Sequence, residues 1–476
     1  MSDSLLGART KAYLYGTQRT SNDAGVGETA CAVSPCGQIP WKGSRQKPRL
    51  QAQRGFWMAS RLSHYFLRFR QFHKNAKLFI YLTFILAVSQ SVFGLVYNLY
   101  ILKLGYTREF LGTLESIPVF VTAALAVPLA LLCVNLPLKK NLLITMVLAV
   151  LAALGLSIFP SKALLISFRF VSGFAGAFMA ITSWPLMAKY STDKDRNYVF
   201  SFQFAFSMLG GFLGNLIGGA LTDWTAVLLS GGLESVEAYR VTMLAGVALM
   251  AVSILPAFYF EEPARTVDAP MKLDLGGVKP AAALMIFLPQ IIIGFGAGMI
   301  MPYLNIFFKT GFNLQISSLG FYMSLMPLSM AAGGFIGPWL VKRKGQVGAM
   351  IILQALSIPF LATMGFSGLI FPTVTAAFVR TMLMNASWPV YSVFMLSHFK
   401  KEAHPLASAM YTAGWSLLWA FGAKLSGTLQ MDFGFTMPFL ITIVCYCIAT
   451  IILSRYFLHE DNKKTAGPAV LKEEMA

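Results

Sequence analysis

The sequence predicts an all-α integral membrane protein with twelve transmembrane helices in two pseudo-symmetric six-helix bundles. Hydrophobic residues make up 56% and charged residues 12% of the 476 residues, and the mean hydropathy is +0.63. The chain therefore has too few polar side chains to cover a soluble globule of this size. Apolar segments of about 20 residues, the length that crosses the hydrocarbon core, recur from Leu78 to Leu458. Short motifs also repeat between the two halves.

The predicted spans alternate with short polar breaks. They are residues 78–102, 109–133, 141–160, 163–188, 199–221 and 240–259 in the first half, and 280–307, 316–341, 346–366, 369–397, 405–428 and 436–457 in the second. Segment 222–239 contains Asp223, Glu234 and Glu237, and a different boundary there would remove a neighbouring span and leave eleven.

The remaining segments are polar or basic. Residues 1–56 are rich in Gly, Ser, Arg, Lys and Gln without apolar periodicity, so we expect a basic tail with no packed structure. An alternative is that this tail is upstream sequence translated in error and that Met58 is the true start. Residues 57–77 combine apolar residues at helical spacing with basic ones, which predicts an amphipathic helix on the membrane surface. We expect residues 260–279 to be a cytoplasmic linker between bundles 78–259 and 280–457, and residues 458–476 to be a cytoplasmic tail.

The distribution of Lys and Arg in the short loops predicts the orientation. One set of loops carries Lys139, Lys140, Lys189, Lys194, Arg196, Arg265, Lys272, Lys279, Lys342, Arg343, Lys344, Lys400 and Lys401, whereas the other set and its flanks carry Lys103, Arg108, Lys162, Arg240 and Lys309. We therefore expect a multi-pass protein of the cell (cytoplasmic) membrane with both termini cytoplasmic. The net charge of +18 reflects this topology and the basic tail, and nucleic-acid binding need not be invoked.

Two motifs recur at nearly the same distance along the chain. Ser183-Trp184-Pro185 reappears as Ser387-Trp388-Pro389, 204 positions later, and Lys103-Leu104-Gly105-Tyr106 is matched by Lys309-Thr310-Gly311-Phe312, 206 positions later. The first pair lies in the fourth span of each half, and the second pair follows the first span of each half. The near-constant offset indicates an internal duplication, in which each six-helix unit carries the same proline near the cytoplasmic end of its fourth span.

This architecture resembles the major facilitator superfamily of secondary transporters. Arg169, followed by Gly173 and small residues, is similar to the superfamily's motif on its fourth helix. The glycine-rich run 210–219 resembles the motif of its drug antiporters, except that Asn215 stands where those have Pro, which weakens an assignment to export. The loop 337–345 looks like the motif that closes the cytoplasmic side, with Val341 in place of Asp. The resemblance implies transport by alternating access around a cavity lined by the first, fourth, seventh and tenth spans.

Ionisable residues inside spans mark candidate functional positions, because a charge in the bilayer is costly unless it is paired or faces water. Glu115 in the second span and Arg169 in the fourth lie at similar depth, so the two side chains could pair. Such a pair is a candidate proton-coupled gate, since protonation of Glu115 would release Arg169; the alternative is a static ion pair. Gln90 and Asn98 in the first span could bond either residue, or could simply hold helices together.

Arg380 lies near the middle of the tenth span, and the predicted spans of the second half contain no Asp or Glu. A guanidinium facing a cavity suits a carboxylate or phosphate on a substrate. The alternatives are bonding to backbone carbonyls and Asn385, or to a partner from the first half. Further candidate substrate contacts are Asn385, Asn305, Gln290, Tyr391 and Trp415. Met299, Met301, Met323, Met326, Met382 and Met384 could add an adaptable apolar lining, although ordinary packing explains most of them.

The sequence contains no metal-ligand cluster and no phosphate-binding loop, so we expect neither an enzyme nor a cofactor. It predicts a monomeric secondary active transporter of a small organic solute, coupled to protons, and favours export of amphipathic compounds slightly over organic-anion transport. The alternative is a membrane receptor or sensor on the same fold, whose tail recruits a partner. Deletion of residues 1–56 separates the two, because a transporter core would keep its flux.

Overall fold

The computed structural model describes residues 69–133, 137–192, 195–232, 234–261, 278 and 280–473, which belong to the compact unit Tyr65–Ala476. The predictions for the tail 1–56 and for most of the linker lie outside these residues. Of the predicted surface helix 57–77, only the last part is described. Residues 69–71 are helical, the chain turns at Phe72 and His73, and the first long helix begins at Lys74 with His73 Nδ1 accepting from the Asn75 amide.

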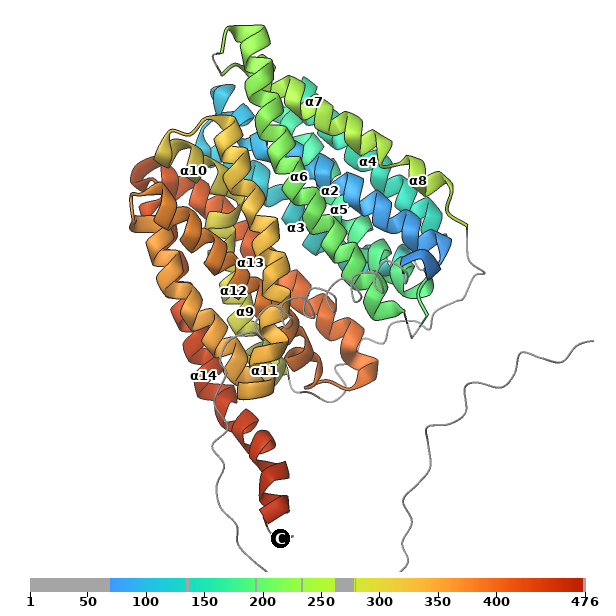
Figure 1. Cartoon of the computed structure of the whole chain (residues 1–476), viewed down its shortest axis with the longest axis vertical. Coiled ribbons are helices and arrows are strands. Elements are labelled where there is room, and N and C mark those ends of the chain that lie inside the picture. The colour runs from blue at the N-terminus through green and yellow to red at the C-terminus, as the bar shows by residue number, and fades with distance from the viewer. Residues whose placement is uncertain are drawn as a thin grey trace, which may run out of the picture. The chain divides into compact units, whose positions relative to one another are not determined.

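Helices account for each of the twelve predicted spans (Figure 1). The first half contains α2 (Lys74–Lys103), α3 (Arg108–Cys133), α4 (Leu138–Ile158), α5 (Lys162–Lys189), α6 (Arg196–Ser230), α7 (Val236–Val252) and the short α8 (Leu255–Phe258). The second half contains α9 (Pro280–Ile300), η1 (Met301–Tyr303), α10 (Leu304–Phe312), α11 (Ile316–Phe366), α12 (Ile370–Leu396), η2 (Lys401–Ala403), α13 (His404–Phe433) and α14 (Thr436–Glu473).

The helix bounds differ from the predicted spans in a few places. Helix α6 continues to Ser230, past the predicted end at residue 221, and α7 begins only at Val236. A helix therefore lies on each side of segment 222–239, and neither neighbouring span is lost. The continuous assignment of α11 contains two spans, because Gly345 has a φ of 73°, outside helical geometry, between predicted spans 316–341 and 346–366. Helix α14 extends beyond the predicted end at residue 457. The all-helical fold class is confirmed in the described part of the chain.

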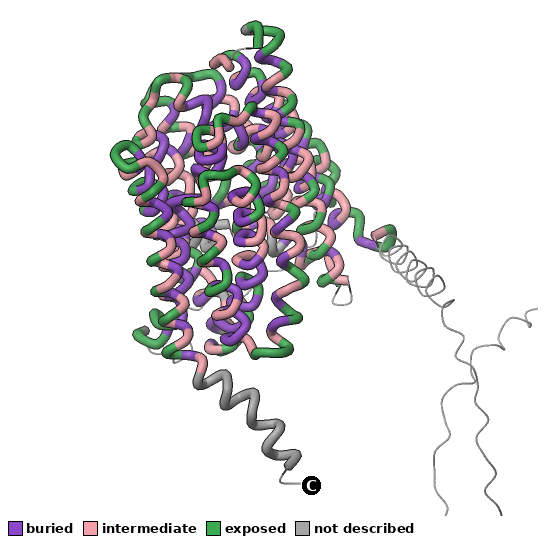
Figure 2. The backbone as a smooth tube through the Cα atoms, turned by 60° about the vertical axis from the view of Figure 1, so that its left-hand side comes forward, coloured by how far each residue is buried: buried purple, intermediate pink, exposed green. Residues whose placement is uncertain are grey.

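Eight helices in the described segments are apolar and long enough to cross a membrane by composition alone. Helix α12 is not among them, and its polar residues explain why: Thr373, Arg380, Thr381 and Ser387 lower its hydropathy, yet all are buried. Large apolar side chains instead cover the outside, including Phe335, Phe371, Leu369, Val227 and Trp339, and Figure 2 shows exposed positions recurring along the helices. An apolar exterior with polar groups inside suits a lipid environment.

Each half packs as a bundle. In the first bundle, α2 packs against α6 and α7, whereas α5 packs against α3 and α4. Glycines permit these close approaches: a Cβ at Gly210 would lie 2.7 Å from the Phe84 carbonyl oxygen, and one at Gly294 would lie 2.8 Å from the Trp415 ring. The bundles meet where α3 packs against α13 and α6 packs against α11.

Among the described residues, a buried apolar cluster joins the two bundles at one side of their interface and not at the other. We call the side on which α2 ends and α3 begins the distal side, and the side on which α2 begins the terminal side. Towards the distal side, one buried cluster includes Tyr100, Leu114, Tyr303 and Phe308, from both bundles. Towards the terminal side, the main clusters belong to one bundle each: one includes Phe79, Leu142 and Leu186, and the other includes Phe287, Tyr391 and Phe457.

Polar contacts also join the bundles on the distal side. Asn98 Nδ2 donates to the Pro302 carbonyl at 2.6 Å and to Asn305 Oδ1 at 3.1 Å. Asn305 Nδ2 in turn donates to the Leu95 carbonyl at 2.9 Å. Asp223 accepts from the Ser317 amide at 2.8 Å, at the start of α11, and Lys309 pairs with Glu234. The structure is therefore closed on its distal side.

Candidate functional site

A buried ion pair joins α3 to α5 in the first bundle. Arg169 Nη2 lies 2.6 Å from Glu115 Oε1, and the two side chains are 11% and 18% exposed. The motif glycines bring these helices together: a Cβ at Gly173 would meet Val121 at 2.6 Å, and one at Gly176 would meet the Thr122 hydroxyl at 3.0 Å. The structure thus places Glu115 and Arg169 in contact, as their similar depth in the sequence suggested.

Two further groups hold the guanidinium of Arg169 in place. Its Nε donates to the Leu114 carbonyl at 2.7 Å, and its Cζ lies 4.8 Å from the ring centroid of Tyr97, close enough for a cation–π interaction. Tyr97 stacks in turn on Phe93, with centroids 5.5 Å apart. Sequence reasoning missed Leu114 and Tyr97. Pro118 could have indicated that the Leu114 carbonyl needs another donor, because a proline has no N–H to bond the carbonyl four residues earlier.

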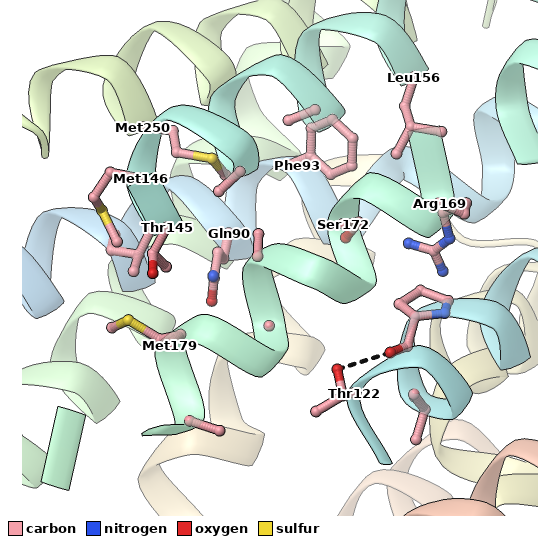
Figure 3. Close-up of a pocket in the computed structure, with 18 of the residues that line it drawn as sticks. Gln90, Phe93, Thr122, Thr145, Met146, Leu156, Arg169, Ser172, Met179 and Met250 are labelled. Atoms are coloured by element: carbon pink, nitrogen blue, oxygen red, sulfur yellow. Dashed lines mark hydrogen bonds between the residues drawn. The ribbon is translucent and has the colours of Figure 1, made fainter. Parts of the chain in front are cut away.

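A pocket of about 640 Å³ adjoins this pair inside the first bundle (Figure 3). It lies between α2 and α7 on one side and α3, α4 and α5 on the other, and we call it the first-bundle pocket. Its lining residues are Leu86, Gln90, Phe93, Pro118, Val119, Thr122, Thr145, Met146, Ala149, Ala153, Leu156, Arg169, Ser172, Ala175, Gly176, Met179, Ala180, Ser183 and Met250. Apart from Gln90 and Arg169, sequence reasoning did not find these residues as a site, because they come from five separate helices.

The pocket has two different ends. Figure 3 places Met146, Met179 and Met250 towards one end and Arg169 towards the other, with Gln90 and Ser172 between them. Methionine side chains are apolar and adapt to irregular shapes, whereas a guanidinium only donates hydrogen bonds. The pocket can therefore hold a molecule with an apolar body and an acceptor group at one end. Its volume lies in the range of about 300–1,000 Å³ that is usual for sites of small organic ligands.

Neither Gln90 nor Asn98 bonds the Glu115–Arg169 pair, and Asn98 follows the alternative prediction, that it holds helices together. Gln90 is exposed towards the pocket, and none of the hydrogen bonds found in the described part of the chain involves its side chain. Asn98 bonds neither Glu115 nor Arg169; its amide bonds Asn305 and the Pro302 carbonyl instead. Asn98 therefore joins the two bundles, as a polar side chain between membrane helices often does.

Arg380 is buried inside the second bundle. It is 4% exposed, its Nη1 lies 3.1 Å from the Met301 sulfur, and its Nη2 donates to the Tyr446 hydroxyl. Its Nε has no hydrogen-bond partner among the described residues. Arg380 also forms no ion pair with any of these residues. Arg380 does not bond Asn385, which donates to the Thr381 carbonyl of its own helix at 2.8 Å.

The remaining predicted substrate contacts serve helix packing in this conformation. The Tyr391 hydroxyl donates to the Ile286 carbonyl at 3.0 Å, and Trp415 packs against Trp419 with ring centroids 4.8 Å apart. Asn305 lies at the distal interface described above, and Gln290 is 5% exposed on α9. None of these residues lines the first-bundle pocket. The structure therefore does not gather the second-half candidates into one site.

No group of His, Cys, Asp or Glu side chains suited to a metal ion is found in the described segments. Cys31 and Cys36 of the tail lie outside them.

Comparison with known proteins gives a family and a fold. The model of the Major Facilitator Superfamily matches residues 79–379 and 286–474, whereas no curated protein sequence matches the chain. A bacterial homologue of the human lysosomal transporter Spinster, in an inward-facing and unoccupied conformation, is 14% identical with a TM-score of 0.64, over 81% of this chain and 98% of its own. The nucleoside transporter NupG is 14% identical with a TM-score of 0.65, over 81% and 100%. The human organic anion transporter MFSD10 is 13% identical with a TM-score of 0.57, over 79% and 99%.

Proposed function

Because this chain belongs to the Major Facilitator Superfamily, we propose that it is a secondary active transporter that moves a small amphipathic organic solute by alternating access, coupled to protons through Glu115. One observation carries the proposal: Arg169, which forms an ion pair with Glu115, lines a pocket that is apolar at one end and polar at the other. Members of this superfamily are transporters, and we therefore expect solute movement and not catalysis.

The charges around Glu115 support the proposed proton coupling. The charged and titratable side chains that face it are Arg169 on α5, Tyr97 on α2 and Tyr303 in η1. With Glu115 ionised, the pair has no net charge, which lowers the cost of holding it inside the membrane. Protonation of Glu115 would leave the guanidinium without its counterion. Arg169 then gains a new counterion only if the protein binds an anion or changes conformation. Either event links protonation of Glu115 to solute binding or movement, as a coupled transporter requires.

Alternating access is supported by the distribution of contacts between the bundles. The shared apolar cluster and the Asn98–Asn305, Asp223–Ser317 and Glu234–Lys309 contacts all lie towards the distal side. We propose that both termini are cytoplasmic, on the basis of the Lys and Arg distribution, so the distal side faces outwards and this conformation is closed to the outside. The similar bacterial Spinster homologue was likewise captured inward-facing. We also propose the cell membrane and a monomeric protein.

The methionines of the pocket are not those on which the sequence argument for export relied. The sequence favoured export because of six methionines, Met299, Met301, Met323, Met326, Met382 and Met384, but the methionines that line the pocket are Met146, Met179 and Met250. The adaptable lining thus supports an amphipathic solute and no longer favours export.

A second candidate is transport of an organic anion that contacts Arg380. The observation that favours it is the buried guanidinium of Arg380, which has the Tyr446 hydroxyl and the Met301 sulfur as its partners and whose Nε is unsatisfied. This candidate requires Arg380 to become accessible in another conformation.

The test is solute-driven proton movement in proteoliposomes that contain a trapped pH dye. The full-length protein is challenged from either side with 2-naphthylmethylamine, 2-naphthamide and 2-naphthoate, which share one apolar body. We expect at least one of them to move protons, and Glu115→Gln to abolish proton movement while solute binding persists. Unchanged proton movement in Glu115→Gln would sink the assignment of Glu115. Loss of movement in Arg380→Gln together with loss of binding would favour the second candidate.

A further inference from the structure

Buried guanidinium groups are found in both bundles, but they differ in what they can reach. Arg169 lines the first-bundle pocket, whereas Arg380 does not and is enclosed by Met301 and Tyr446. If the solute carries a negative charge, the pocket therefore brings that charge to Arg169 and not to Arg380.

The polar groups of the pocket divide into those already bonded and those available to a ligand. The hydroxyls of Thr122, Thr145 and Ser183 each donate to a backbone carbonyl at 2.8 Å, to Pro118, Asn141 and Met179 respectively. The side chains of Gln90 and Ser172 take part in none of the hydrogen bonds found between described residues, and both residues line the pocket. Available polar groups thus lie along the path that leads to Arg169 (Figure 3).

Arg169 itself has donors to spare. Its Nε bonds the Leu114 carbonyl and its Nη2 bonds Glu115, whereas no bond is found between Nη1 and another described residue. A carboxylate suits this geometry, because it can accept from two guanidinium nitrogens in parallel. While Glu115 is ionised, it occupies Nη2 of Arg169. A second carboxylate therefore cannot accept from Nη1 and Nη2 together until Glu115 is protonated.

We propose that the first-bundle pocket binds an organic carboxylate with an apolar body, and that its carboxylate replaces protonated Glu115 on Arg169. This inference rests on the proposed function and names its substrate class. The proton stays on Glu115 Oε1 or Oε2, the Arg169–Glu115 ion pair is exchanged for an Arg169–ligand ion pair, and the net charge of the occupied site is the same as before. Ligand and proton therefore bind together. Glu115 is faced by Arg169, Tyr97 and Tyr303, of which Arg169 alone carries a charge at neutral pH.

The remainder of the pocket selects the body of the ligand. Phe93, Met146, Met179 and Met250 surround the space away from Arg169. Gln90 can accept and donate a hydrogen bond partway along, so a body with one polar substituent fits as well as a bare hydrocarbon. A doubly charged or sugar-like molecule would place polar groups against the methionines without partners.

The experiment measures equilibrium binding of 2-naphthoate and its neutral amide, 2-naphthamide, to the full-length protein in nanodiscs. Empty nanodiscs correct for partition into lipid. We expect naphthoate to bind more tightly at pH 5.5 than at pH 7.5, by up to about a hundredfold, because uptake of one proton with the ligand changes the affinity about tenfold per pH unit. Naphthamide should bind equally at both pH values. Glu115→Gln, which mimics the protonated acid, should bind naphthoate tightly at both pH values.

Pocket-filling variants locate the site. Ala180→Phe places a ring into the pocket, and Ala248→Phe on α7 is the matched control, because Ala248 is exposed and does not line the pocket. We expect roughly a tenfold or greater loss of naphthoate binding in Ala180→Phe alone. Equal binding of naphthoate and naphthamide, no binding of naphthoate, or loss of binding only in Arg380→Gln would each overturn the inference.

The two proposals fail in different ways. If naphthoate binds as described but no naphthalene probe moves protons in proteoliposomes, the proposed transport function fails and the binding site stands. If protons move with the amine or the amide and naphthoate does not bind, the transport function stands and the carboxylate site fails.

Discussion

The Nε–H of Arg169 donates to the Leu114 carbonyl at 2.7 Å, the carbonyl that the backbone N–H of residue 118 would bond in an unbroken helix. Residue 118 is a proline inside α3, so the carbonyl of Leu114, four residues earlier, has no helical donor. In a membrane such a carbonyl needs another partner. The Leu114 carbonyl therefore gains a donor from α5, and the buried guanidinium of Arg169 gains an acceptor. This hydrogen bond anchors Arg169 beside Glu115.

This relationship predicts the effect of Pro118→Ala. The alanine N–H would bond the Leu114 carbonyl and compete with Arg169, so the guanidinium would be held less firmly. Because a hydrogen bond to a charged group contributes about 1.5–3 kcal/mol, we expect proton-coupled flux to fall by about tenfold, measured with the trapped pH dye. The control is Pro128→Ala in the same helix, since Pro128 is exposed and does not line the pocket. Equal flux in the two variants would contradict the anchoring role of Leu114.

The distal contact between Asp223 and Ser317 predicts a reversible lock. The Asp223 carboxylate lies 2.8 Å from the Ser317 amide across the two bundles, so cysteines at both positions are close enough to be tested for disulfide formation. In a variant without the natural cysteines, we expect oxidation of Asp223→Cys/Ser317→Cys to stop flux and reduction to restore it. Each single cysteine serves as a control. Full flux with the cross-link formed would show that the distal side need not open.

The surroundings of Arg380 predict a stability effect of Tyr446→Phe. Removal of the hydroxyl leaves a buried guanidinium with fewer partners, and we expect the free energy of unfolding to fall by about 1–3 kcal/mol. Tyr456→Phe on the same helix is the control, because Tyr456 is 57% exposed and a change there should stay within about 0.5 kcal/mol. Unfolding in mild detergent, followed by tryptophan fluorescence, measures both. Identical stabilities would mean that Arg380 has another acceptor.

The near-constant spacing of the repeats also appears in the distal contacts. Asn98 and Asn305 are 207 positions apart, close to the offsets of the two motifs, and the two amides bond each other at 3.1 Å across the bundles. This offset is what an internal duplication predicts for corresponding positions of the two halves. The duplication could be predicted from the sequence, but the meeting of these two residues could not, because it depends on which faces of α2 and α10 turn towards one another.

By itself the sequence predicted the helices and the shared depth of Glu115 and Arg169, and it indicated a duplication. Those features depend on the order of residues along the chain, because a span needs a certain length to cross a bilayer and a charge inside the bilayer is costly. Only the tertiary structure decided that the pocket lies inside the first bundle, that Arg380 faces Tyr446, and that Asn98 and Asn305 join the bundles. These depend on the rotation and close packing of helices far apart in sequence, and small residues such as Gly173 and Gly298 set those distances.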